Sequence, residues 1–177
     1  MVIDAIVTRK ADGTDDFHAA IGDLFARGAR IPADHPEAGQ PAKWAEPRSL
    51  ESMLENGLDA NATLVENRIL LSSLCAAVWL GGFDRAAVLV KHGADVNYAV
   101  AAYDITALHF AVCAPEPTPL VSMLLAHGAR SMRSRGMPSQ IVPPRHRSTE
   151  IERERLTPRE LATRLGLPDV VALFPGE

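Results

Sequence analysis

The sequence predicts an all-α protein made of stacked helix-turn-helix units. Apolar helical stretches that end in glycine recur along the chain, alanine and leucine supply most of the 47% of hydrophobic residues, and aromatic residues make up only 5%. A β-sandwich would contain more β-branched and aromatic residues. The 13 prolines and 12 glycines indicate that the helices are short and separated by frequent turns.

The glycine-ended stretches repeat at a roughly regular spacing. Their glycines lie 29, 36 and 35 residues apart, at Gly28, Gly57, Gly93 and Gly128. A period in the thirties is typical of helix-turn-helix arrays. Because glycine readily adopts the left-handed conformation that ends many helices, we expect each of these residues to follow the last turn of a helix.

A second recurring element precedes the later copies. Ser72–Val78, Thr106–Val112 and Thr157–Ala162 each begin with a hydroxyl residue and continue mostly with small and apolar residues. Ser or Thr caps a helix N-terminus, and Pro158 suits a first turn, where its missing N–H is not needed. Each segment is therefore expected to begin the first helix of a unit.

These two elements together resemble the ankyrin repeat. Thr106–Ala111 is similar to the family's Thr-Pro-Leu-His-x-Ala helix start, and Gly93–Asn97 has the family's sequence Gly-Ala-Asp-Val-Asn. The resemblance covers roughly residues 68–174. It implies a solenoid in which each unit packs against its neighbours, with short hairpin loops between the units.

The resemblance divides the 177 residues of a single domain into successive units. No helix start of the family type precedes Gly57, and an extra segment after Gly128 breaks the period. The expected units are an N-terminal cap or degenerate repeat (1–35), a degenerate repeat (36–67), two repeats (68–101 and 102–130), an Arg- and Pro-rich insertion (131–155) and a C-terminal capping repeat (156–177).

The sequence contains no recognisable catalytic or metal-binding motif. It lacks a glycine-rich phosphate loop, a nucleophile elbow and metal-type His or Cys spacings. The resemblance makes His109 a helix-start residue that bonds to nearby backbone, and a catalytic site around His109 and Asp104 is the alternative. Cys75 and Cys113 are expected to be packing residues rather than nucleophiles or disulfide partners. We therefore expect no enzymatic activity, no cofactor and no metal.

A partner-binding surface is the functional feature that the resemblance implies. In ankyrin-like stacks, the hairpin tips and the inner faces of the first helices contact partners. The corresponding positions here are rich in apolar, aromatic and basic residues, and Trp, Tyr and Arg are common in binding hot spots. They are Arg68, Ile69, Leu71, Trp79, Leu80, Tyr98, Tyr103, Ile105, Arg155 and Arg164. The alternative for the aliphatic and aromatic side chains is packing in the core beneath the hairpins.

The insertion 131–155 is a second candidate for partner binding. Five arginines lie between positions 130 and 147 without an acidic residue, and Arg133 and Arg135 are among them. A loop of this length is either functional or disordered. One interpretation is a basic finger whose Arg133 and Arg135 bind carboxylates of a partner, and the other is a solvated insertion.

The expected function is non-enzymatic binding of one protein partner through the concave face. The chain looks like ankyrin-type immunity proteins that neutralise a cognate bacterial toxin, or like an adaptor for an enzyme. The alternative is a secreted bacterial effector that acts on a host protein. The net charge of −4 argues against a nucleic-acid partner, and no apolar run approaches the ~18 residues of a membrane span. We expect a cytoplasmic protein that is a monomer when free.

Overall fold

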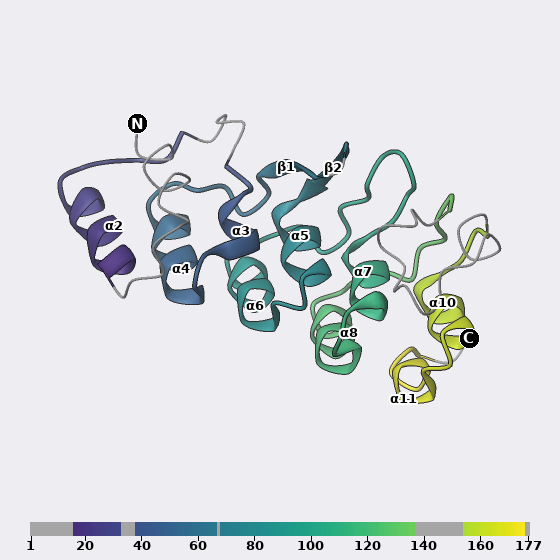
Figure 1. The fold of residues 1–177 in the computed structure, drawn as a ribbon. Helices are drawn as coiled ribbons and strands as arrows, with labels where there is room; N and C mark the ends of the chain where they lie inside the picture. Colours follow the sequence, from purple (N-terminus) through teal and green to yellow (C-terminus); the bar gives the residue numbers. More distant parts are fainter. Residues whose placement is uncertain (1–15, 33–37, 67, 137–153, 176–177) are drawn as a thin grey trace. The chain divides into compact units, whose positions relative to one another are not determined.

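The computed structural model describes residues 16–32, 38–66, 68–136 and 154–175. This part of the chain is mostly helical and contains one two-stranded sheet (Figure 1). Its elements are α2 (Asp16–Ala26), α3 (Pro41–Trp44), α4 (Pro47–Glu55), β1 (Thr63–Glu66), β2 (Ile69–Ser72), α5 (Ser73–Trp79), α6 (Phe83–Lys91), α7 (Ala107–Cys113), α8 (Pro117–Ala126), α10 (Pro158–Arg164) and α11 (Pro168–Val171).

The chain divides into two compact units. Unit 1 comprises Met1–Ala76 and Asp84–Ala94, and unit 2 comprises Ala77–Phe83 and Asp95–Glu177. Helix α5 runs across the boundary. Two of the described helices fall within each of the expected units 36–67, 68–101, 102–130 and 156–177. The predominantly helical character is therefore confirmed, whereas the division into these units stays a prediction.

In unit 1, α2 packs against α4. Ile21 on α2 and Leu50 and Met53 on α4 are almost completely buried. The turns that follow the two helices also touch, because the Ile31 N–H lies 3.5 Å from the Asn56 carbonyl oxygen. Two apolar helix faces thus form the core of this unit, as the amphipathic pattern of α4 requires.

The sheet of unit 1 corrects the all-α prediction. β1 and β2 pair antiparallel, with Leu64 opposite Leu71 and Val65 opposite Leu70. Both strands contain β-branched or leucine residues, and each has buried as well as exposed or half-buried positions, which suits a half-buried hairpin. Arg68 has a φ of 65°, as tight hairpin turns require. A loop was expected here because each strand has only four residues, too few to give a clear period.

In unit 2, two helix pairs stack on one another. α7 packs beside α8, α10 packs against both α7 and α11, and α11 packs against α8 (Figure 1). Leu108 and Phe110 on α7, Leu124 on α8 and Leu161 on α10 are fully buried. First helix therefore meets first helix, and second helix meets second helix.

The four glycines of the repeated pattern end helices as predicted. Gly28, Gly57, Gly93 and Gly128 have φ values between 83° and 105°. At each one, the glycine N–H bonds to the carbonyl three residues earlier and the next N–H bonds to the carbonyl five residues earlier. This is the Schellman arrangement, which satisfies the last carbonyls of a helix. The same bonds follow α5 at Gly81 and α10 at Gly166.

The hydroxyl residues at two of the helix starts also act as predicted. Ser72 Oγ accepts the Cys75 N–H at 3.2 Å at the start of α5. At the start of α10, Thr157 Oγ1 accepts the Glu160 N–H at 3.2 Å, and the Glu160 carboxylate accepts the Thr157 N–H at 2.7 Å. The second case is a capping box, in which two unpaired N–H groups are satisfied at once.

Among the described residues, none of the helices combines the length and apolar character that crossing a membrane would need.

Candidate protein-binding site

Helix α7 organises the candidate site in unit 2. The segment that leads into α7 folds back on itself, because Val100 and Ile105 form an antiparallel bridge. Asp104 has a φ of 52°, and its N–H bonds to the Val100 carbonyl at 2.8 Å. This hairpin places Tyr103 at its turn. The fully buried Ile105 anchors the hairpin below.

Trp79 rests on the same helix. Its ring centroid lies 6.1 Å from that of Phe110 on α7, with an angle of 49° between the rings. Phe110 is fully buried, whereas Trp79 is half-buried. Aromatic rings in such tilted contact hold each other in place. Leu80 follows directly and keeps 49% of its surface exposed, so a braced indole and an exposed leucine stand together at the end of α5.

Arg135 joins the hairpin through both backbone and side chain. Its N–H donates to the Tyr103 carbonyl at 2.7 Å, and its guanidinium forms an ion pair with Asp104. Its side chain is 63% exposed. The start of the 131–155 insertion is thereby fixed beside Tyr103, and the exposed part of the guanidinium stays available to a second carboxylate.

Asn97 ties the same hairpin to the turn after α8. Its Nδ2 donates to the Gly128 carbonyl at 3.1 Å, and its Oδ1 accepts the Arg130 N–H at 2.8 Å. Its own N–H bonds to Asp95 Oδ1 at 2.8 Å. The side chain therefore satisfies backbone groups of a neighbouring turn, which fixes the position of the hairpin carrying Tyr98, a half-buried residue.

His109 lies beneath this surface and is fully buried. Its Nδ1 accepts the Thr106 N–H at 3.1 Å, so Nε2 carries the proton and donates to the Leu156 carbonyl at 3.2 Å. Burial lowers the pKa of His109 to about 4, because the charged form would lose its hydration. A neutral imidazole that bonds to two backbone groups is a structural element, so this geometry gives no support to the alternative of a catalytic His109.

Leu156 is also where the two described ends of the insertion meet. Its carbonyl accepts the Ser134 N–H at 2.9 Å, and its N–H donates to Ser134 Oγ at 3.2 Å. Ser134 is almost fully buried. Residues 131–136 and 154–156 are therefore fastened to each other and, through His109, to α7. Three further arginines of the insertion, Arg145, Arg147 and Arg153, lie outside the described residues.

The remaining arginines of the predicted surface form contacts within unit 2. Arg133 donates to the Arg155 carbonyl at 2.5 Å and pairs with Glu160 at 2.8 Å. Arg164 pairs with Glu154. The Thr157 N–H, followed by Arg133, lowers the pKa of Glu160, so this carboxylate stays charged. Arg133 and Arg164 are therefore held in defined positions by acidic neighbours.

The structure sorts the predicted contact residues into three groups. Leu71 and Ile105 are buried, which corrects the prediction that they line a free surface and agrees with the core alternative. Arg68 and Ile69 belong to unit 1, where the exposed Arg68 lies in the hairpin turn and the half-buried Ile69 begins β2. The remaining residues lie in unit 2 and are exposed or half-buried: Trp79, Leu80, Tyr98, Tyr103, Arg133, Arg135, Arg155 and Arg164.

The described residues offer little for other chemistry. They contain no group of three His, Cys, Asp or Glu side chains placed to hold a metal ion. Burial raises the pKa of the Cys113 thiol to about 12, so the reactive thiolate does not form near neutral pH. Cys75 is buried and does not form a disulfide.

Three exposed apolar residues were not among the contact residues predicted from the sequence. Phe83 is 40% exposed at the start of α6, and Val65 and Leu70 are 63% and 51% exposed on the hairpin of unit 1. The pair of glycines before Phe83 marks a turn, which is a signal that its side chain stands at a helix end. For Val65 and Leu70, only the strand register shows that they share one face.

Comparisons with known proteins do not assign the chain to a family. No protein-family model matches the chain, and no curated protein is significantly similar to it in sequence.

Proposed function

We propose that this chain is a non-enzymatic, ankyrin-type binding module that recognises one protein partner through unit 2. The observation on which the proposal depends is Trp79, half-buried and braced on Phe110 beside the exposed Leu80. Tyr103 and Arg135 are fixed on the hairpin that leads into the same helix. Aromatic and arginine side chains held in place before binding contribute strongly to interfaces, since little conformational entropy is lost on association.

Two kinds of local order support the ankyrin-type part of the proposal. The glycine turns recur at the predicted spacing, and the helix pairs of unit 2 stack first helix on first helix. His109 bonds to the backbone that precedes the next helix pair, as the resemblance implies. Neutralisation of a toxic enzyme is the specific role we propose for this binding.

The test is affinity purification with the tagged full chain from the organism that encodes it. We expect one protein in stoichiometric amount that is retained at high salt. Trp79→Ala should weaken this complex by more than ~1 kcal/mol. His127→Ala is the control, because His127 is exposed and its side chain bonds within its own helix, to the Met123 carbonyl. Absence of any partner, or equal binding by both variants, would refute the proposal.

A second variant separates lost contact from lost folding. Trp79→Ala also removes packing on Phe110, whereas Leu80 is half-exposed, so Leu80→Lys should leave the thermal midpoint unchanged and still weaken the complex. The specific role is tested by co-expression. If the captured partner arrests bacterial growth, the wild-type chain should restore growth and Leu80→Lys should restore it less. Growth arrest that the wild-type chain does not relieve would rule out the immunity role while leaving the binding role intact.

A further inference from the structure

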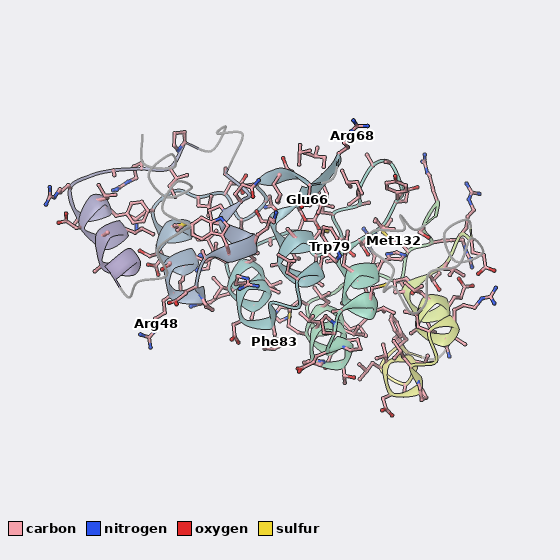
Figure 2. The ribbon with its side chains drawn as sticks, viewed as in Figure 1. Arg48, Glu66, Arg68, Trp79, Phe83 and Met132 are labelled. Atoms are coloured by element: carbon pink, nitrogen blue, oxygen red, sulfur yellow. The ribbon has the colours of Figure 1, made fainter. Side chains whose placement is uncertain are left out.

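The hairpin of unit 1 shows two different faces. Leu64 and Leu71 are opposite each other and buried, and Val65 and Leu70 are opposite each other and 63% and 51% exposed. Directly opposite side chains of an antiparallel pair touch. The outer face of the hairpin therefore presents an apolar cross-strand pair to solvent, with Arg68 extending from the tip (Figure 2).

The backbone groups of Leu70 point away from β1. Hydrogen-bonded and non-hydrogen-bonded pairs alternate along an antiparallel ladder. The Ser73 N–H bonds to the Ala62 carbonyl at 2.9 Å, so pairing of Ala62 with Ser73 fixes the alternation. Val65 and Leu70 then form a non-hydrogen-bonded pair. Within the described part of the chain, the N–H and C=O of Leu70 have no hydrogen-bond partner.

The outer edge of β1 is covered within unit 1. A Cβ atom at Gly39 would lie 2.7 Å from the Thr63 carbonyl oxygen, so the backbone before α3 lies directly against the first residue of β1. Lys43 of α3 reaches the other end of the strand and pairs with Glu66. The open edge of this hairpin is therefore β2.

β2 also lacks the features that protect edge strands from pairing. Natural edges contain lysine, proline, bulges or inward-facing charges. The strand here is Ile69, Leu70, Leu71 and Ser72, paired without a bulge. Arg68, immediately before it, is exposed and has no ion pair among the described residues. The unprotected edge of β2 favours an extended backbone as its binding partner, and the adjacent Arg68 favours a negative charge on that partner.

We propose that the β2 edge of unit 1 binds an extended segment of a partner protein, which adds a third strand to the sheet. The segment bonds to the N–H and C=O of Leu70, places an apolar side chain beside Leu70 and Val65, and places a carboxylate near Arg68. A second copy of β2 fits less well, because antiparallel pairing centred on Leu70 sets Ser72 rather than an acidic residue opposite Arg68. This surface is independent of the unit 2 site on which the proposed function depends.

The experiment is selection of a phage-displayed library of random twelve-residue peptides on the full-length chain. We expect the selected peptides to alternate branched or aromatic residues with polar ones, to contain an acidic residue near one end and to lack proline in the centre. Helical spacing of the apolar residues, or no peptide that binds when titrated as a synthetic peptide, would overturn the proposal.

Backbone pairing is then tested on the best synthetic peptide. Methylation of a peptide nitrogen that faces Leu70 should weaken binding at least tenfold, whereas methylation of the next nitrogen, which faces away, should change it less than threefold. Equal effects would rule out strand addition. Hydrogen exchange should show the Leu70 amide unprotected in the free chain and protected in the complex, and an amide protected in the free chain would contradict the open edge.

Variants of the chain complete the test. Leu70→Pro removes the outward N–H and should weaken binding of the peptide at least tenfold. Leu70→Ala keeps the N–H and should weaken this binding less. Proline is tolerated at edge positions whose N–H faces solvent, and the methylated peptides test the same bond if this variant fails to fold. Trp79→Ala should leave peptide binding unchanged, which separates this inference from the proposed function. Dimerisation of the free wild-type chain that Leu70→Pro abolishes would assign the edge to a second copy instead.

Discussion

In unit 1 the hairpin before α5 consists of two regular strands, whereas in unit 2 the hairpin before α7 has a single bridge between Val100 and Ile105 among its described residues. The first is held by close backbone packing at Gly39. The second is held by polar groups, namely Asn97, Arg135 and, beneath it, His109. The first hairpin also has polar contacts, from Glu66 to Lys43 and from Asn61 to the Gly93 carbonyl, but these leave Val65 and Leu70 exposed on its outer face.

The two units nevertheless share one device. Asn61 bonds to Asp59 Oδ1 through its N–H and to the Gly93 carbonyl through its side chain, and Asn97 makes the same two bonds to Asp95 and Gly128. The sequence Asp-x-Asn forms a turn of its own and leaves the amide free to reach the next glycine turn. Only what surrounds this device differs between the hairpins, and the following experiments test that difference.

The largest effect is expected from the buried histidine of unit 2. His109 has an ordinary pKa of 6.5 when unfolded and about 4 when folded. Between these values the unfolded chain binds more protons, so stability falls as the pH drops from about 6.5 to 4 and is fully retained above that window. The shift corresponds to about 3 kcal/mol. Urea titrations of the wild type and His109→Gln at pH 7 and pH 4.5 should show the difference between their free energies of unfolding shrinking at the lower pH.

The hairpin of unit 1 is expected to be sensitive to one methyl group. Gly39→Ala places a Cβ 2.7 Å from the Thr63 carbonyl oxygen and 2.8 Å from its carbon. The backbone must shift, at a cost of about 1–3 kcal/mol. Gly22→Ala is the matched control, since Gly22 lies within α2 with no atom within 4 Å of the added carbon, and it should stabilise the helix by up to ~1 kcal/mol. Equal effects on the free energy of unfolding would disprove the close contact.

The shared device predicts equal rather than different effects. Asn61→Ala and Asn97→Ala should each lower the free energy of unfolding by ~1 kcal/mol, because each removes a side-chain bond to a glycine carbonyl. Asn56→Ala, whose side chain bonds only within its own helix turn at Ser52, should cost less. A large effect at one asparagine alone would show that the two hairpins are not held by the same device.

The smallest effect is expected at the surface of unit 2. The side chain of Arg135 is 63% exposed and pairs with Asp104, and such exposed pairs contribute little. Arg135→Ala should change the free energy of unfolding by less than ~0.5 kcal/mol. Arg48→Ala should have a similarly small effect, because Arg48 is exposed and forms no ion pair within the described part of the chain. A loss above ~1 kcal/mol would show that the guanidinium, rather than the Arg135 N–H bond to Tyr103, holds the insertion in place.

The parts of the fold that were predicted correctly depend on signals from residues close together in the chain. The glycines ended helices at the predicted positions because left-handed geometry favours a residue without a Cβ. Ser72 and Thr157 capped helices because their side chains reach nearby N–H groups. The site was harder to predict. Leu71 and Ile105 precede the helix-start motifs, whereas Trp79 and Leu80 follow one, and all four were predicted as contact residues. Only the packing around Leu71 and Ile105 decided that they are buried.

By itself, the sequence determined the predominantly helical character and where several of the helices begin and end, since these depend on residues close together in the chain. The tertiary structure decided the rest. It paired Val65 with Leu70, fastened Ser134 to Leu156 and placed His109 against the Leu156 carbonyl. These contacts join residues that are far apart in sequence or depend on strand register, and their energies depend on burial, which no local pattern specifies.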